Sequence, residues 1–154
     1  MVNQLEIKII EEIDGFTADQ IIEFTSQVPE FEDSYAQEEY IARMAGKKSL
    51  VLFAYLEQQP VGFKLGYEQH PLYFYSWMGA VLPQFRKQGV AKILAKAQEN
   101  WACQNSFKFI RMKTRNYLKN MLHFALSNDF YITGIEPHPD PMNNRILLEK
   151  ILNK

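Results

Sequence analysis

The chain has 154 residues, of which 47% are hydrophobic and 23% are charged, a composition that fits one soluble globular domain with a single core. A formal net charge of −1 argues against a general nucleic-acid binder, which would carry a basic excess. Cys103 is the only cysteine, which excludes an intrachain disulfide and a cysteine-based metal cluster and favours a reducing, cytoplasmic compartment. No secretory signal and no membrane-spanning run are visible.

The first part of the chain predicts one strand followed by two helices. Apolar and polar residues alternate over residues 5–9, which is typical of a strand. Residues 18–25 and 35–44 have apolar positions at helical spacing, and we expect Thr17 and Ser34 to cap these helices at their N-termini.

Three strands are expected in the middle of the chain. The apolar runs 49–56 and 61–67 are separated by a short turn and predict a hairpin. The long run 72–82 is rich in Tyr, Phe and Trp, which favour strands. Gly79 lies inside this run, where an isolated glycine indicates either a bulge or a close backbone approach.

Helices and strands alternate in the second half of the chain. The clearest helix has an apolar face formed by Val90, Ile93, Leu94, Ala97 and Trp101. Further strands are expected over 107–113, 130–135 and 146–152, with a helix after Asn116 between the first two. The order β-α-α-β-β-β-α-β-α-β-β predicts one mixed α/β domain over residues 1–154.

The segment Arg86-Lys87-Gln88-Gly89-Val90-Ala91 joins the third of the middle strands to the clearest helix. The first N–H groups of a helix have no partner within the helix and carry the positive end of its dipole. An anion bound there satisfies both, Gly89 and Ala91 leave room for it, and Arg86 and Lys87 add positive charge. The alternative is a helix that merely begins with basic residues, at a small cost against the dipole. The segment contains neither a Walker-type loop nor a dinucleotide-binding fingerprint.

Two segments and the order of the elements make the chain resemble the GNAT superfamily, the Gcn5-related N-acetyltransferases. Residues 81–94, Val-Leu-Pro-Gln-Phe-Arg-Lys-Gln-Gly-Val-Ala-Lys-Ile-Leu, are similar to the family's strand-turn-helix with its Arg/Gln-x-x-Gly-x-Gly/Ala motif. Residues 113–116, followed by 121–124 and 128–130, resemble the later strand-helix-strand. The resemblance implies a central mixed, mostly antiparallel sheet of about seven strands, with helices on both faces and a splayed parallel strand pair.

The resemblance also implies that acetyl-CoA is the cosubstrate and lies between the two splayed strands, here 72–82 and 107–113. The backbone of Ala80, Val81 and Leu82 would then contact the pantetheine arm. The N–H groups of Gln88, Gly89, Val90 and Ala91 would bind the pyrophosphate, flanked by Arg86, Lys87 and Lys92. Asn116 is a further expected contact on the pantetheine side, with a helix N-cap as its alternative role.

The family's reaction is the direct attack of an amine on the thioester, without a covalent enzyme intermediate. Many relatives use a tyrosine to protonate the leaving thiolate, but Ala125 stands at that position here, and Asp129 replaces a nearby glycine. A thiol pKa near ~8.5 makes the thiolate a reasonable leaving group even without an acid. Tyr131 and Tyr117 are the candidate substitutes, with packing as their alternative role. Glu68 is the candidate base, with a solvated carboxylate beside a turn as the alternative.

The acceptor amine is expected between the Glu30-Phe31 loop and the aromatic central strand. Tyr75 and Trp77 are candidates for lining its pocket, although some of the aromatic residues must belong to the core. The acidic stretch around Glu30 either favours a cationic amine or stabilises the start of the following helix. His70, His123 and His138 are scattered along the chain and predict no metal site.

Three functions stay open from the sequence alone. The first is an acyl-CoA-dependent N-acyltransferase, most simply an N-acetyltransferase, acting on a small-molecule or peptide amine as a monomer or homodimer. The second is a catalytically weak domain that binds acetyl-CoA as a sensor. The third is a phosphate-binding module unrelated to coenzyme A. None of them involves nucleic acid or a membrane, and the fold does not determine the amine.

Overall fold

The strands in the described part of the chain pair into one seven-stranded sheet in the order β1-β2-β3-β4-β5-β7-β6. Their bounds are β1 Leu5–Ile10, β2 Ser49–Leu56, β3 Gln59–His70, β4 Tyr73–Val81, β5 Phe109–Arg115, β6 Tyr131–Glu136 and β7 Arg145–Ile151. The structure is a computed structural model that describes residues 4–31 and 35–152. Neighbouring strands are antiparallel except β4 and β5, which confirms the predicted mixed, mostly antiparallel sheet.

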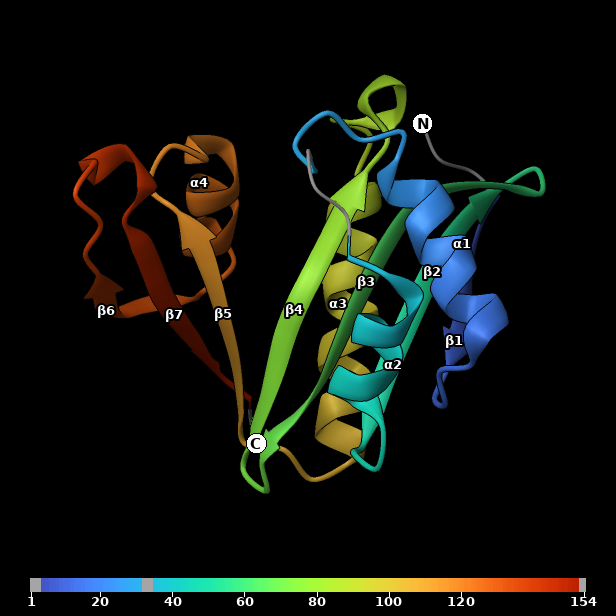
Figure 1. The fold of residues 1–154 in the computed structure, drawn as a ribbon, viewed down its shortest axis with the longest axis horizontal. Coiled ribbons are helices and arrows are strands. Elements are labelled where there is room, and N and C mark those ends of the chain that lie inside the picture. Colours follow the sequence, from blue (N-terminus) through green and yellow to red (C-terminus); the bar gives the residue numbers. More distant parts are fainter. Residues whose placement is uncertain (1–3, 32–34, 153–154) are drawn as a thin grey trace.

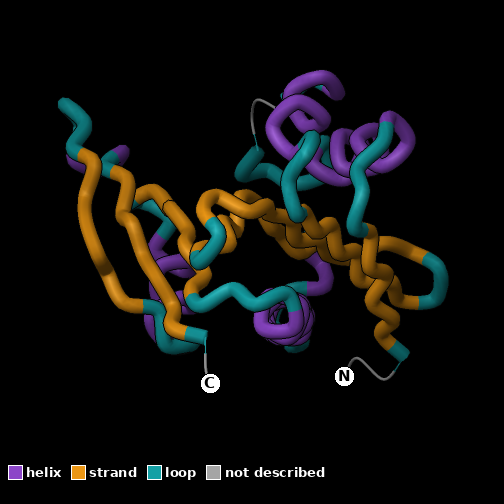
Figure 2. Tube along the Cα trace, turned by 90° about the horizontal axis from the view of Figure 1, so that it is seen from below, coloured by secondary structure: helices purple, strands orange, loops and turns teal. Residues whose placement is uncertain are grey.

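Helices cover both faces of this sheet, as predicted. The bounds are α1 Gly15–Thr25, α2 Gln37–Met44, α3 Val90–Gln104 and α4 Lys119–Ser127, with short 3-10 turns at Pro83–Phe85 and Pro141–Asn143. Helices α1 and α2 lie on one face, and α3 lies on the opposite face (Figures 1 and 2). Over the described ranges, no helix is long and apolar enough to cross a membrane.

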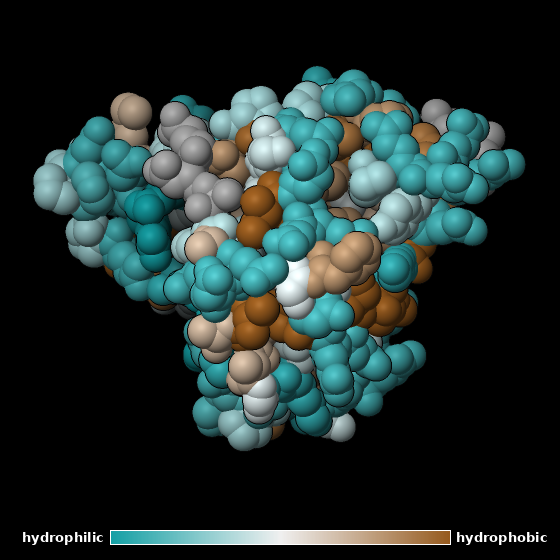
Figure 3. Space-filling model, turned by 45° about the vertical axis from the view of Figure 1, so that its right-hand side comes forward, coloured by the Kyte–Doolittle hydropathy of each residue, from teal (hydrophilic) through white to brown (hydrophobic). Residues whose placement is uncertain are grey.

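Apolar side chains are buried on each face of the sheet. Phe24 of α1 packs against Phe63 of β3 on one face, and Trp101 of α3 packs against Phe74 of β4 on the other. Side chains alternate along a strand, so Lys64 points to the opposite face from its neighbour Phe63. The surface in Figure 3 is mainly hydrophilic, with apolar side chains in smaller groups between the polar ones.

Strands β4 and β5 pair along only part of their length. The parallel register joins Tyr73–Ser76 of β4 to Phe109–Met112 of β5. Both strands continue beyond this segment, and they diverge into a V that opens toward the turn before α3 (Figure 1). The splayed parallel pair that the family resemblance implied is therefore present.

A β-bulge marks the apex of the V. The register between β3 and β4 shifts between Leu65 and Gly66, which leaves Trp77 as the extra residue on β4. The prediction of a bulge at Gly79 is wrong, because Gly79 pairs regularly with Lys64. The alternative, a close backbone approach, fits: a Cβ at position 79 would lie 3.3 Å from the backbone carbonyl oxygen of Phe63. It would also lie 3.3 Å from Lys64 Cγ and 3.6 Å from Lys64 Nζ.

The starts of the first two helices differ from the sequence prediction. Asp14, and not Thr17, caps α1, because its carboxylate accepts a hydrogen bond of 2.8 Å from the backbone N–H of Thr17. Helix α2 begins at Gln37, and Ala36 occupies its N-cap without a side-chain hydrogen bond. The predicted cap Ser34 lies outside the described residues. A capping side chain one turn away was missed because several polar residues near each helix start satisfy the same sequence rule.

Candidate active site

The turn before α3 lies at the open end of the V (Figure 1). The N-cap of α3 is Gly89, whose φ of 89° is left-handed, and no side chain caps the helix. Lys87 also has a left-handed φ of 63°. The first turn of α3 contains no acidic residue, and residues 86–89 are exposed. An anion at this turn would satisfy N–H groups that the helix itself leaves without a partner.

Helix α1 shows the opposite arrangement at its own N-terminus. The carboxylate of Asp14 occupies the position that an external anion would take, and it accepts from Thr17 N at 2.8 Å. The hydrogen bonds from the backbone and side chain of Thr17 hold the pKa of the Asp14 carboxyl below its usual value. The sequence therefore supplies an anion to α1 and supplies none to α3.

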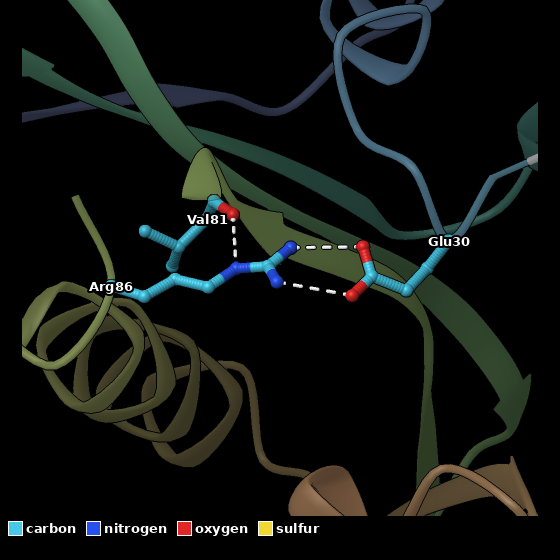
Figure 4. Close-up of polar contacts among 3 residues, drawn as sticks. All are labelled: Glu30, Val81 and Arg86. Atoms are coloured by element: carbon cyan, nitrogen blue, oxygen red, sulfur yellow. Dashed lines mark hydrogen bonds and ion pairs between the residues drawn. The ribbon is translucent and has the colours of Figure 1, made fainter. Parts of the chain in front are cut away.

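Arg86 does not extend freely from the turn, because Glu30 holds it (Figure 4). The guanidinium donates to the two carboxylate oxygens of Glu30 at 3.0 and 2.9 Å, and its Nε donates to the carbonyl of Val81 at 2.9 Å. The hydrogen bonds from Arg86 lower the pKa of the Glu30 carboxyl. Two residues predicted for different ligands, one for the cofactor and one for the acceptor, are thus in direct contact. Lys87 and Lys92 are exposed cations on either side of Gly89.

Ala80 and Val81 at the end of β4, and the following residue Leu82, lead directly into this turn, and their contact with the pantetheine arm stays a prediction. The N–H of Leu82 donates to the carbonyl of Val61 at 2.9 Å. The carbonyl of Val81 already accepts one hydrogen bond and has a second lone pair. Beyond its paired segment, β4 has no strand neighbour among the described residues on the side of the V. Part of this edge is therefore open to an extended ligand.

Asn116 follows β5 on the other arm of the V. Its side-chain amide donates to the carbonyl of Pro141 at 3.1 Å. The N-cap of α4 is Leu118, which makes no side-chain cap hydrogen bond, so the expectation that Asn116 caps this helix is wrong. Contact between Asn116 and the pantetheine arm stays a prediction.

A narrow cavity of about 20 Å³ lies between α3, α4 and β5, with Lys64 of β3 in its lining. Its lining includes Lys64 from β3, Gln98 and Glu99 from α3, Met112 from β5 and Ala125 from α4. This volume holds about one water molecule. The half-buried cation of Lys64 and the buried amide of Gln98 therefore face a cavity whose lining is otherwise largely apolar. Ala125 contributes only a methyl group, so the acid that many relatives place there is absent.

Lys64 reaches this cavity by crossing over Gly79. Burial lowers the pKa of the Lys64 ammonium from 10.5 to about 8, and the negative charge of Glu99 partly offsets this effect. Glu99 itself is paired with Lys150 at 2.8 Å. Within the described ranges, Lys64 Nζ makes no hydrogen bond or ion pair, and Gln98 Nε2 is also buried without a partner. Gln98 Nε2 is therefore a buried donor without an acceptor, and the Lys64 ammonium has no partner from the described residues.

Five aromatic residues on the α2 side of the sheet surround the bulge, and we call Tyr35, Tyr40, Tyr67, Tyr75 and Trp77 the aromatic cluster. The Trp77 ring lies 5.3 Å from Tyr35, 5.4 Å from Tyr40 and 5.9 Å from Tyr67 between ring centroids. The guanidinium of Arg43 lies 4.4 Å from the Trp77 centroid, in cation–π geometry. Burial raises the pKa of the Tyr75 hydroxyl. The predicted acceptor residues Tyr75 and Trp77 thus belong to one cluster that already accommodates a cation.

Phe31, the remaining acceptor candidate, is next to Glu30 and packs against the core. Its ring lies 6.3 Å from the ring of Phe63 between centroids. The structure therefore links Glu30 to the turn of α3 and Phe31 to the core under α1.

The two catalytic candidates lie away from the V. Glu68 is near the hairpin end of β3, where it pairs with Phe74. Tyr131 is on the edge strand β6, three strands from β4 in the sheet order, and its side chain is 65% exposed. The structure does not bring either residue next to the turn of α3, so both roles stay predictions.

A comparison with protein-family models identifies the family of this chain. The model described as the acetyltransferase (GNAT) family matches residues 16–130. The chain belongs to this GNAT acetyltransferase family. None of the curated proteins compared with it matches the sequence.

Solved structures share the GNAT fold at low sequence identity. Ard1 from Thermoplasma volcanium has a TM-score of 0.79 at 18% identity and covers 96% of this chain and 99% of its own. The ribosomal-protein-S18-alanine N-acetyltransferase from Escherichia coli has a TM-score of 0.80 at 10% identity, with coverages of 97% and 96%. A GNAT family acetyltransferase from Elizabethkingia anophelis with acetyl-CoA bound has a TM-score of 0.69 at 18% identity, with coverages of 95% and 98%.

The sequence interpretation missed Lys64, Gln98 and Arg43 as residues of the site. A signal for the first was present, because Lys64 interrupts the apolar run 61–67. Gln98 lies four residues after Leu94 and so falls on the apolar face of α3, where a polar side chain is unusual. Nothing in the local pattern marks Arg43, which became notable only when α2 packed over β4.

Proposed function

We propose that the protein transfers an acetyl group from acetyl-CoA to a primary amine by direct attack. The observation that carries this proposal is the start of α3, which lies at the open end of the V (Figure 1) and has Gly89 as its N-cap with no capping side chain. A pyrophosphate would accept hydrogen bonds from this turn, with Lys87 and Lys92 as neighbouring cations. Lys87 and Gly89 supply the positive φ angles that expose the backbone there.

The residues along the V fit an extended arm that carries hydrogen-bond acceptors. The unpaired edge of β4 offers backbone groups to such an arm. Gln98 Nε2 and Thr114 Oγ1 are buried and have no hydrogen-bond partner in the described structure. Thr114 lies on β5 on the same face as Met112, which lines the cavity. The amide groups of pantetheine would give these polar atoms partners.

In this proposal the thioester lies near the apex of the V, beside the aromatic cluster. The amine nitrogen attacks the carbonyl carbon, the C–N bond forms, and the C–S bond breaks with its electron pair on sulfur. The developing oxyanion needs N–H donors, which the irregular backbone around the bulge at Trp77 could supply. The amine must also lose a proton, for which Glu68 is the sequence-predicted base.

The acceptor is a primary amine, and its chemical class sets the choice of assay. The Escherichia coli structural neighbour is named as an N-acetyltransferase of an alanine in a ribosomal protein, which suggests peptide amines as one class of acceptor to assay. The cation–π contact of Arg43 with the aromatic cluster shows that a positive charge is accommodated there, which suggests small cationic amines as the other.

The test is transfer from acetyl-CoA over a panel of peptide and small-molecule amines, followed by release of the free thiol with a thiol reagent. Mass spectrometry of the amine would identify the product. We expect turnover with at least one class and none with the Gly89→Leu variant. Binding of acetyl-CoA without transfer to any amine would favour the sensor function, for which Ala125 is the motivating observation. Absence of binding would overturn the cofactor assignment itself.

A further inference from the structure

We propose that Lys64 is the acid that protonates the thiolate of coenzyme A as it leaves, and this inference rests on the proposed acetyl transfer. The relevant geometry is the crossing of Lys64 over β4. Lys64 is on β3, yet its Nζ lies 3.6 Å from the place where a Cβ of Gly79 would be. Gly79 has no side chain, so the ammonium reaches the cavity beside the open edge of β4.

The surroundings of Lys64 leave its ammonium available to a ligand. Glu99 of α3 is the carboxylate that faces it, but Glu99 is held by Lys150 of β7 at 2.8 Å. Gln98 of the same helix adds a buried amide without a partner, which points independently to a missing acceptor in this cavity. Helix α4 contributes Met121, Phe124 and Ala125 to the lining of the cavity, and none of these side chains can donate a proton to the sulfur.

The proton balance is simple. The amine nitrogen forms the C–N bond and loses one proton to the base, and the C–S bond breaks with its electron pair on sulfur. The sulfur then takes the proton from Lys64 Nζ, which gives the free thiol and a neutral lysine. Solvent then returns the proton to Lys64. Burial gives Lys64 a pKa of about 8 in the free protein, close to the ordinary thiol value of ~8.5, so its ammonium can release a proton to a thiolate near neutral pH.

The decisive experiment measures the thiol pKa of bound coenzyme A from the ultraviolet absorbance of its thiolate, without any turnover. A cation beside the sulfur lowers this pKa, and we expect the wild-type complex to lie about 1–3 units below the Lys64→Met complex. Lys64→Arg keeps the charge and should retain the lowered thiol pKa. Lys96→Met is the matched control, because Lys96 is an exposed lysine on α3.

Acetyl transfer provides the second readout. We expect Lys64→Met to lower kcat on the order of tenfold or more, with the KM for acetyl-CoA little changed. Lys64→Arg should not restore kcat, because a guanidinium does not release its proton in this pH range. The kcat profile of the wild type should fall as pH rises through about 8, and this limb should be absent in Lys64→Met.

The outcomes separate the two proposals. If coenzyme A binds with the same thiol pKa in the wild type and in Lys64→Met, Lys64 does not contact the sulfur and the inference is wrong, while the proposed function stands. If coenzyme A does not bind the wild type at all, the proposed function and the inference both fail. Calorimetry of coenzyme A binding distinguishes these cases before any titration.

Discussion

The turn before α3 and the cavity between α3 and α4 both hold hydrogen-bond donors without a partner among the described residues, but they are built differently. The turn is a single exposed segment whose donors are backbone N–H groups around Gly89. The cavity lies inside the fold, and its donors, the half-buried Lys64 and the buried Gln98, come from two separate elements. Exposed donors are solvated, so they cost little folding free energy when no ligand is bound, whereas buried donors without a partner do cost folding free energy. The unpartnered donors of the cavity should therefore lower the free energy of unfolding, whereas the donors of the turn should affect it little.

The largest expected effect comes from removing the open backbone of the turn. In Gly89→Leu the side chain occupies the place of the anion, so we expect coenzyme A affinity to fall by at least about 100-fold, a loss of roughly 2.7 kcal/mol. Calorimetry measures this directly.

The matched control for that variant is Gly46→Leu. Gly46 has a left-handed φ of 71° and open space around its Cβ position, as Gly89 has. Both variants therefore carry a similar backbone strain of about 1–2 kcal/mol. An equal loss of coenzyme A affinity in the two variants would show that strain, and not the anion position, is responsible.

The second-largest expected effect concerns Lys64 and the pH dependence of the free energy of unfolding. The pKa of Lys64 is about 8 in the folded protein and 10.5 in the unfolded chain, so the unfolded state binds more protons between these values. The stability of the wild type should then rise as pH increases from about 8 to 10.5. Lys64→Met should be about 2–3 kcal/mol more stable than the wild type at pH 7 and lack this rise.

Urea unfolding at a series of pH values measures this difference, with Lys96→Met as the exposed control. A wild-type stability that does not change through this pH window would mean that Lys64 keeps its ordinary pKa in the fold. The cavity would then be no more costly than the turn, and the contrast between the two regions would disappear.

The smallest expected effect concerns the ion pair between Glu30 and Arg86 beside the turn. Glu30→Gln removes the carboxylate that holds Arg86 and leaves the guanidinium free for a phosphate. Partly exposed ion pairs contribute about 0.2–1 kcal/mol, so we expect coenzyme A affinity to increase up to about fivefold. Glu39→Gln is the control, because Glu39 pairs with Arg43 at 3.0 Å and does not touch the turn. A lower affinity in Glu30→Gln would show that Glu30 positions Arg86 for the ligand.

The two regions also differ in what the sequence could predict. The residues of the turn are contiguous in the sequence, so the glycine, the basic residues and the apolar face of the following helix could be recognised as one motif. The fold could be predicted separately, from the order of the elements. To predict the cavity, one would have to know that Lys64 and Gly79 are register partners and that α3 packs against them. Only the tertiary structure gives this information. The contact between Glu30 and Arg86 joins residues 56 positions apart, beyond any local rule. The same limit explains why Asn116 was given a capping role that Leu118 occupies.

The most direct test of the account is an NMR titration of the labelled protein with coenzyme A. We predict that the backbone amide signals of residues 88–91 and the side-chain amide signals of Gln98 shift together, because one ligand would reach both regions. The backbone amide of Thr17, which Asp14 already occupies, should stay unchanged. Shifts that leave residues 88–91 unaffected would contradict the assignment of the turn before α3 as the pyrophosphate site.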